Sequence, residues 1–119
     1  LKNAAIIEDL RRPLFEIKKV TRYELELPCS DHAMVVYYQA QTDCVAEKVK
    51  MMALNHLMNQ DYFNELRTTQ QLGYLVGAGY APFNTRAGIA FYIQSPKFDS
   101  KTLLHRHTHF VNGDFFNFH

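Results

Sequence analysis

The chain has 119 residues, of which 47% are hydrophobic and 21% are charged, a balance typical of a folded globular domain rather than a disordered segment. Thirteen basic and 12 acidic side chains leave a formal net charge of +1, which gives no indication of nucleic acid or an anionic membrane as a partner. No apolar run approaches the roughly 20 residues that a membrane-spanning helix needs.

Three elements are predicted in the first 40 residues. Residues 1–12 are expected to form a short helix that ends before the first proline, because the residue before a proline avoids helical geometry. Apolar and charged side chains then alternate over residues 15–27, which predicts a half-exposed strand that ends at Pro28. The β-branched and aromatic residues of segment 33–40 predict a second, buried strand.

Apolar residues at helical spacing follow in the middle of the chain. We expect an amphipathic helix from Cys44 to Met58, with Thr42 or Asp43 as its N-cap. The apolar stripe expected on this helix consists of Val45, Val49, Met52, Ala53 and His56.

A second, shorter helix is predicted directly after the first. Asn59 or Asp61 can cap it, and it is expected to run through residues 66–68 until Gly73 breaks it. A β-hairpin should follow, and its first strand begins with Leu72, Tyr74 and Val76. The turn-rich loop 81–86 leads to its second strand, one face of which is formed by Ile89, Phe91 and Ile93.

The last predicted element is a helix capped by Asp99 or Ser100. Its apolar stripe consists of Leu103, His107, Phe110 and Val111, and the chain then ends on Phe115, Phe116 and Phe118. Together these elements predict an α+β fold, with an antiparallel sheet and helices packed on one face.

A histidine cluster in the last helix is the first candidate for a metal site. His105 and His109 lie four residues apart and can share one helical face, which suits zinc. A zinc peptidase also needs a general-base carboxylate, and Thr108 stands before His109, so neither the HExxH nor the HxxEH pattern is present. We therefore expect a polar helix face with His107 half-buried, and no metal ligands in this chain.

Two cysteines give no disulfide framework. Cys29 and Cys44 are expected to be small buried thiols. Cys44 lies at a predicted helix start, where the pKa of a thiol can fall, but no histidine is placed beside it to make a catalytic pair.

Arg67 and Tyr74 are the candidate substrate-binding and auxiliary catalytic residues. Arg67 lies near a helix C-terminus, where a cation is favoured, and its five N–H donors can grip a carbonyl oxygen or an oxyanion. Tyr74 lies at a strand start, and its hydroxyl group can also donate. A tight turn between them can direct both side chains at one groove. In the alternative interpretation, Arg67 pairs with a surface carboxylate, and Tyr74 packs on the protein with its hydroxyl in water.

The same stretch resembles the insulysin–pitrilysin (insulinase, M16) family of zinc metallopeptidases. The resemblance rests on Phe63, Leu66-Arg67-Thr68, Gln71-Leu72-Gly73-Tyr74 and the later Ile93-Gln94-Ser95-Pro96, and runs most clearly over residues 40–110. It implies a metallopeptidase half-domain of LuxS/MPP-like fold. It also implies that residues 1–119 are a single partial domain from the C-terminal, zinc-free half of such an enzyme.

In this family, zinc is held in the N-terminal half by an H-x-x-E-H motif and a downstream Glu, none of which maps onto this chain. The resemblance therefore implies zinc as the cofactor of the full-length enzyme, with the N-terminal half and peptide substrates as partners. Arg67 and Tyr74 match the family residues that bind the substrate backbone near the scissile bond and help to stabilise the tetrahedral intermediate. The fragment alone is expected to be inactive.

Two other functions stay open at the level of the sequence. A non-catalytic structural or interaction subunit of the same superfamily would have the same scaffold, although it need not keep Arg67 and Tyr74. A stand-alone metal-binding module would use His105 and His109. The family includes periplasmic and cytosolic members, so the resemblance does not fix the compartment, the substrate preference or the oligomeric state.

Overall fold

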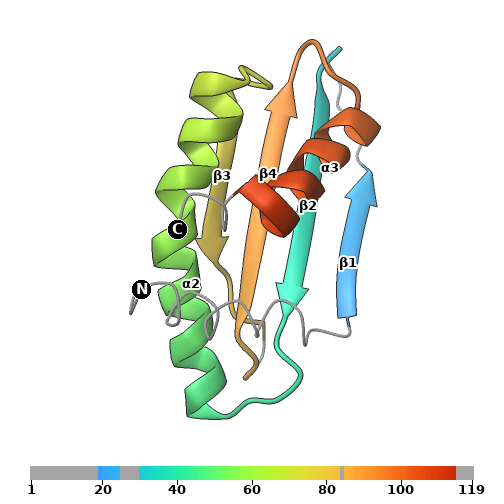
Figure 1. Ribbon diagram of the computed structural model, residues 1–119. Helices are drawn as coiled ribbons and strands as arrows, with labels where there is room; N and C mark the ends of the chain where they lie inside the picture. Colours follow the sequence, from blue (N-terminus) through green and yellow to red (C-terminus); the bar gives the residue numbers. More distant parts are fainter. Residues whose placement is uncertain (1–18, 25–29, 84, 115–119) are drawn as a thin grey trace.

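The computed structural model describes residues 19–24, 30–83 and 85–114. Its centre is a four-stranded antiparallel sheet with the order β1-β2-β4-β3 (Figure 1). The strands are β1 (Lys19–Glu24), β2 (His32–Gln39), β3 (Leu75–Tyr80) and β4 (Gly88–Ser95). The two early strands and the later hairpin are thus confirmed. Four parts of the prediction lie outside the described residues: the helix over 1–12, the outer parts of the first strand, Cys29 and the three terminal phenylalanines.

Both long helices cover the same face of the sheet (Figure 1). Helix α2 (Val45–Phe63) runs along β3 and continues into a π-helical segment, η1 (Asn64–Thr69). Helix α3 (Ser100–His109) packs on β2 and continues into a second such segment, η2 (Phe110–Asp114). The α+β fold with helices on one face is therefore confirmed. Within the described ranges, no helix is both long enough and apolar enough to cross a bilayer.

The core lies between this sheet face and the helices. On β4, Ile89, Phe91 and Ile93 are buried while Tyr92 is 38% exposed, as the alternating pattern predicts. In the register between β2 and β4, Val36 lies beside Phe91, so both side chains are on the same face of the sheet. Alternation therefore assigns one sheet face to the core and leaves the other to Tyr37, Tyr92 and Leu75, which are partly or largely exposed.

The start of α2 differs from the prediction. Its N-cap is Cys44, whose side chain makes no capping hydrogen bond, so neither Thr42 nor Asp43 caps the helix. Thr42 instead donates its hydroxyl to Cys44 Sγ over 3.5 Å. The thiol is exposed rather than buried, which also corrects the expectation for Cys44.

The predicted apolar stripe of α2 faces the wrong way. Val45, Val49 and Met52 are 73%, 60% and 52% exposed. The side chains that α2 buries against the sheet are Met51, Leu54, Met58 and Tyr62. The helix has apolar residues on two sides, so helical periodicity by itself could not decide which side meets the sheet.

The second predicted helix does not exist as a separate element. Backbone helix runs without interruption from Val45 to Thr69, so neither Asn59 nor Asp61 is an N-cap. Only the hydrogen-bond spacing changes after Phe63, where the turn widens and Gln70 N–H donates to Glu65 O over 2.9 Å. This long rod carries Arg67 to the end of the sheet where β3 begins.

Helix α3 agrees closely with the sequence. Asp99 is its N-cap and its carboxylate accepts a hydrogen bond from Thr102 N over 2.9 Å. The predicted stripe of Leu103, His107, Phe110 and Val111 is buried. His107 was expected to be half-buried, but it is fully buried.

His107 is buried between two tyrosines. Tyr38 Oη lies 2.8 Å from His107 Nε2, and Tyr62 Oη lies 3.0 Å from Nδ1. The ring also packs against Phe91, with centroids 4.8 Å apart. Each ring nitrogen of His107 thus has a tyrosine hydroxyl as a partner, and the tautomer of the ring decides which nitrogen donates. Burial raises the pKa of Tyr62 well above its ordinary value, so this tyrosine keeps its proton at neutral pH.

Candidate functional site

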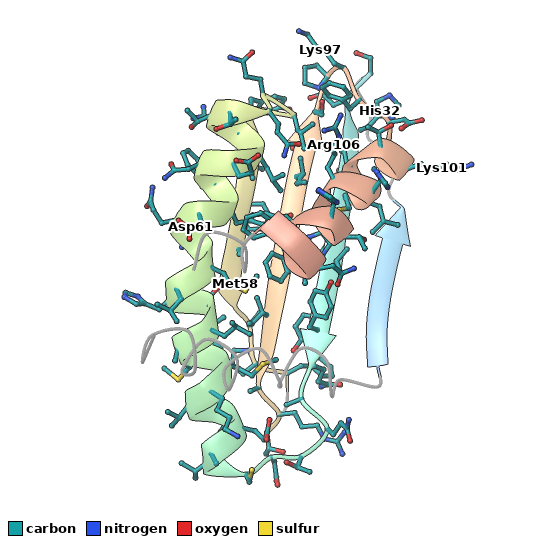
Figure 2. All side chains as sticks on the ribbon, viewed as in Figure 1. His32, Met58, Asp61, Lys97, Lys101 and Arg106 are labelled. Carbon is teal, nitrogen blue, oxygen red and sulfur yellow. The ribbon has the colours of Figure 1, made fainter. Side chains whose placement is uncertain are left out.

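A surface groove of about 470 Å³ lies at the end of the sheet where α2–η1 ends and β3 begins. Lys97 and His32 mark this end in Figure 2, where β4 ends and β2 begins. The groove is lined by Arg67, Thr68, Gln71, Leu72, Gly73, Tyr74, Pro96 and Lys97. Arg67 and Tyr74, which the sequence singled out, therefore lie on one groove rather than on opposite sides of the sheet.

The turn that brings these two residues together is made by Gln71. Its φ is 54°, in the left-handed region, and no other described non-glycine residue has a positive φ. Leu72 N–H donates back to Leu66 O over 3.0 Å, and both leucine side chains are buried. The helix therefore ends at Thr69, just before this turn, and not at Gly73. The strand begins at Leu75, three residues later than predicted.

Gly73 serves a different purpose from the one expected. Its φ is not in the left-handed region. A Cβ at this position would lie 2.1 Å from the carbonyl oxygen of Gln94, far inside van der Waals contact. Only glycine lets the segment before β3 pass this close to the end of β4. Gly73 thus allows the segment that carries Tyr74 to lie close to the end of β4.

Arg67 is held at the groove by two contacts. Its Nε–H donates to the backbone carbonyl oxygen of Tyr74 over 3.2 Å. Its guanidinium carbon lies 5.1 Å from the centroid of the Phe63 ring, one helical turn back. The terminal nitrogens carry four more N–H groups, and the side chain is exposed. Arg67 is therefore oriented while its terminal donors face solvent at the groove.

The phenol of Tyr74 is also oriented, by Asp31, which directly precedes β2, and by Gln94 on β4. Its hydroxyl donates to Asp31 Oδ2, and Gln94 Nε2 donates to the same oxygen over 3.2 Å. The sequence did not single out Asp31, because it lies 43 residues before Tyr74 and only the sheet brings the two together. Gln94 was part of the family pattern, but its link to Tyr74 was not foreseen.

The far wall of the groove is a turn built on Ser95. This serine is fully buried, and its Oγ accepts hydrogen bonds from the backbone N–H groups of Lys97 and Phe98, both over 3.1 Å. The turn places the exposed Lys97 beside the groove. Arg67 and Lys97 make the groove cationic, which suits carbonyl oxygens and carboxylates as ligands.

The other sequence candidates lie elsewhere. His105 and His109 are exposed on α3. Within the described ranges, no three His, Cys, Asp or Glu side chains come close enough together to hold a metal ion. Hydrogen bonding from Thr42 lowers the pKa of the Cys44 thiol, but Cys44 lies at the opposite end of α2 from the groove. The described residues therefore do not fit a zinc site, and the groove is the candidate site.

Comparison with known proteins identifies a family for this chain. The family described as PQQ synthase PqqF-like, C-terminal lobe domain 4, matches residues 53–115, which is just over half of the chain and includes the whole groove. The chain belongs to this family. The resemblance to the C-terminal part of insulinase-type peptidases is thereby confirmed.

This PqqF-like domain is also similar to individual proteins. Coenzyme PQQ synthesis protein F of Pseudomonas syringae pv. tomato is 34% identical over 67 residues, and insulin-degrading enzyme of Homo sapiens is 36% identical over 62 residues. The alignments cover 56% and 52% of this chain, but only 9% and 6% of those proteins. The domain is therefore related to peptidases, and it corresponds to a small part of the relatives that it matches.

Proposed function

We propose that this domain is the substrate-holding part of the C-terminal half of a zinc metalloendopeptidase, and that residues 1–119 form one partial domain of that half. In this proposal Arg67 and Tyr74 bind the backbone of a peptide near the bond that is cut. Loop 81–86 and strand 87–94 shape the wall of the chamber that encloses the peptide. The observation that carries the proposal is that Arg67 and Tyr74 line one groove, each held by its own contacts.

The chemistry of the groove supports this role. An arginine carries only donors, and its terminal N–H groups can stabilise the negative charge that develops on a peptide carbonyl oxygen. Because contacts to Phe63 and to the Tyr74 carbonyl hold the side chain, little ordering is left to be done when a peptide arrives. The domain would thus bind and orient the substrate without supplying the metal ligands.

The remaining machinery would come from outside this domain. The described residues fit no metal site. In the proposal, zinc is held by the N-terminal half of the same protein, which is also the partner of this domain. The domain by itself would then be inactive towards peptides.

The test uses the full-length protein that contains this domain. Arg67→Ala should lower peptide turnover by about 100-fold, the scale of losing one transition-state donor, and Tyr74→Phe should also lower it. Bound zinc should stay unchanged in both variants. Lys101→Ala, which removes an exposed cation on α3, is the matched control and should keep full turnover.

Two results would contradict the proposal. Unchanged turnover in both variants would remove the groove from catalysis and favour a structural or interaction subunit. Loss of zinc together with turnover would mean that the substitutions disturb the metal-holding half instead of substrate binding.

A further inference from the structure

A second cation on the groove, Lys97, has no part in the proposed function. Among the described residues that line the groove, Arg67 and Lys97 are the charged ones, and both are cations. Lys97 follows Ser95, the last residue of β4, after one proline (Figure 2), whereas Arg67 lies in η1. Two separate parts of the chain therefore each place a positive charge on the same groove.

The backbone at Lys97 is held in place, while its side chain is exposed. The buried Ser95 Oγ accepts hydrogen bonds from the backbone N–H groups of Lys97 and Phe98, both over 3.1 Å. Within the described part of the chain, the ammonium group of Lys97 has no hydrogen-bond or ion-pair partner. All three of its N–H donors are thus available to a ligand.

Two carboxylates lie near the turn that carries Lys97, and both have other partners. Asp31 accepts hydrogen bonds from Tyr74 and Gln94. Asp99 accepts one from the backbone N–H of Thr102, as the N-cap of α3. The positive charge of Lys97 is therefore not paired with either of them.

The two cations of the groove suit different groups of a peptide. Arg67 offers a planar set of donors, whereas Lys97 offers a compact point charge. For such a charge a carboxylate is the strongest partner that a peptide contains, because both groups of the hydrogen bond are then ionised. The proposed function places the interior of a peptide in this groove, where a carboxylate comes from an Asp or Glu side chain and not from the chain end.

We infer that Lys97 determines substrate specificity: it binds an acidic side chain of the peptide close to the backbone that lies in the groove, and so selects peptides that carry Asp or Glu at that position. This inference rests on the proposed function, because it requires a peptide in the groove. It adds a side-chain preference to a site that otherwise contacts only the backbone.

The test compares matched peptide substrates in the full-length protein. The peptides are amidated at the C-terminus, and at one position at a time on either side of the cut bond they carry Glu or its neutral counterpart Gln. At one position the wild-type enzyme should cleave the Glu peptide with a kcat/KM about 2- to 5-fold higher, the range of one exposed ion pair. This preference should shrink as the salt concentration rises, because salt screens exposed charges.

Variants of Lys97 then assign the preference to this side chain. Lys97→Met keeps an apolar stem without the charge and should abolish the preference. Lys97→Glu should reverse it, so that a peptide with Lys at the same position is cleaved better than the one with Glu, a result that a purely structural role of Lys97 would not give. Lys101→Met removes an exposed cation of α3 that does not line the groove, and should retain the wild-type preference.

The possible failures are distinguishable. If Arg67→Ala and Tyr74→Phe lower turnover but the wild-type enzyme prefers Glu at no position, the groove is functional and the inference is wrong. If the preference persists in Lys97→Met, or appears only in peptides with a free C-terminus, Lys97 does not select an acidic side chain. If Arg67→Ala and Tyr74→Phe leave turnover unchanged, the proposed function fails first, and this inference fails with it.

Discussion

Replacing Tyr62 by phenylalanine isolates one buried hydrogen bond in the core. The Tyr62 hydroxyl lies 3.0 Å from Nδ1 of the fully buried His107. Phenylalanine keeps the ring contacts to Phe91 and Phe110, at centroid distances of 4.9 and 5.2 Å. Tyr62→Phe therefore removes little except the hydroxyl and its hydrogen bond to a buried ring nitrogen. The expected loss in the free energy of unfolding is about 1–3 kcal/mol.

Urea denaturation measures this loss as a lower midpoint at an unchanged m value. Tyr38→Phe is the matched control, since it removes the hydroxyl group on the other side of the same imidazole. Tyr38 is only half-buried, so water can reach the vacated position and the loss should be smaller. His107→Leu combined with Tyr62→Phe should cost less than the sum of the two single changes, because neither then leaves a buried polar partner.

The reasoning would be refuted by either of two results. Tyr38→Phe could prove as costly as Tyr62→Phe, which would mean that burial does not set the cost. The double variant could instead show strictly additive losses, which would mean that Tyr62 and His107 are not coupled.

Three further predictions concern the frame of the groove and the cap of α3. Gly73→Ala should destabilise the domain by about 1–3 kcal/mol, because its Cβ would meet the Gln94 carbonyl oxygen. Thermal denaturation measures this loss, and an unchanged midpoint would show that β4 can shift to make room for the added Cβ. Gln71→Val should lower the denaturation midpoint and Gln71→Gly should not, since a β-branched residue is disfavoured at a φ of 54°; equal midpoints for the two variants would contradict this. Hydrogen bonds from Thr102 lower the pKa of Asp99 below its ordinary value of 3.8, so its capping contribution is complete above that pH and is lost as the pH falls through the folded-state pKa. The difference in denaturation midpoint between wild type and Asp99→Ala should therefore shrink in acid, and a difference that is constant down to acid pH would exclude this linkage.

Local patterns predicted the elements whose environment is set by their own sequence. In strand β4, Ile89, Phe91 and Ile93 are buried, whereas the residues between them, Ala90, Tyr92 and Gln94, are partly or largely exposed. Asp99 caps α3 through a bond to a residue three positions away. Such signals are complete within a few residues, so no knowledge of the fold was needed.

Predictions failed where contacts with a distant part of the chain determine the environment of a residue. Helix α2 is apolar on two sides, and the position of the sheet selected Met51 and Leu54 over Val45 and Val49. Gly73 looked like a helix breaker, but its real constraint is the carbonyl of Gln94, which the sequence places 21 positions later. Contacts of this kind exist only once the strands have paired.

The candidate site divides in the same way. Arg67 and Tyr74 were found because their chemistry and family pattern are local to one short stretch. Their supports were only partly visible: Phe63 lies in that pattern, whereas Asp31 joins the site through the sheet. A short motif therefore revealed the groups that face the ligand, and pairing across strands supplied the groups that hold them.

The widened helical turn at Asn64–Thr69 has a consequence for how this chain tolerates change in length. In a π-helical turn a backbone N–H donates to the carbonyl five residues earlier instead of four. Such a turn accommodates one extra residue, and the helix continues without a break. Deleting one residue there would restore ordinary helical spacing, so the residues after it would keep their orientation around the helix axis. The same deletion inside α2 would turn every later helical position by about 100°. The chain therefore tolerates the loss of one residue in this segment better than elsewhere in the rod.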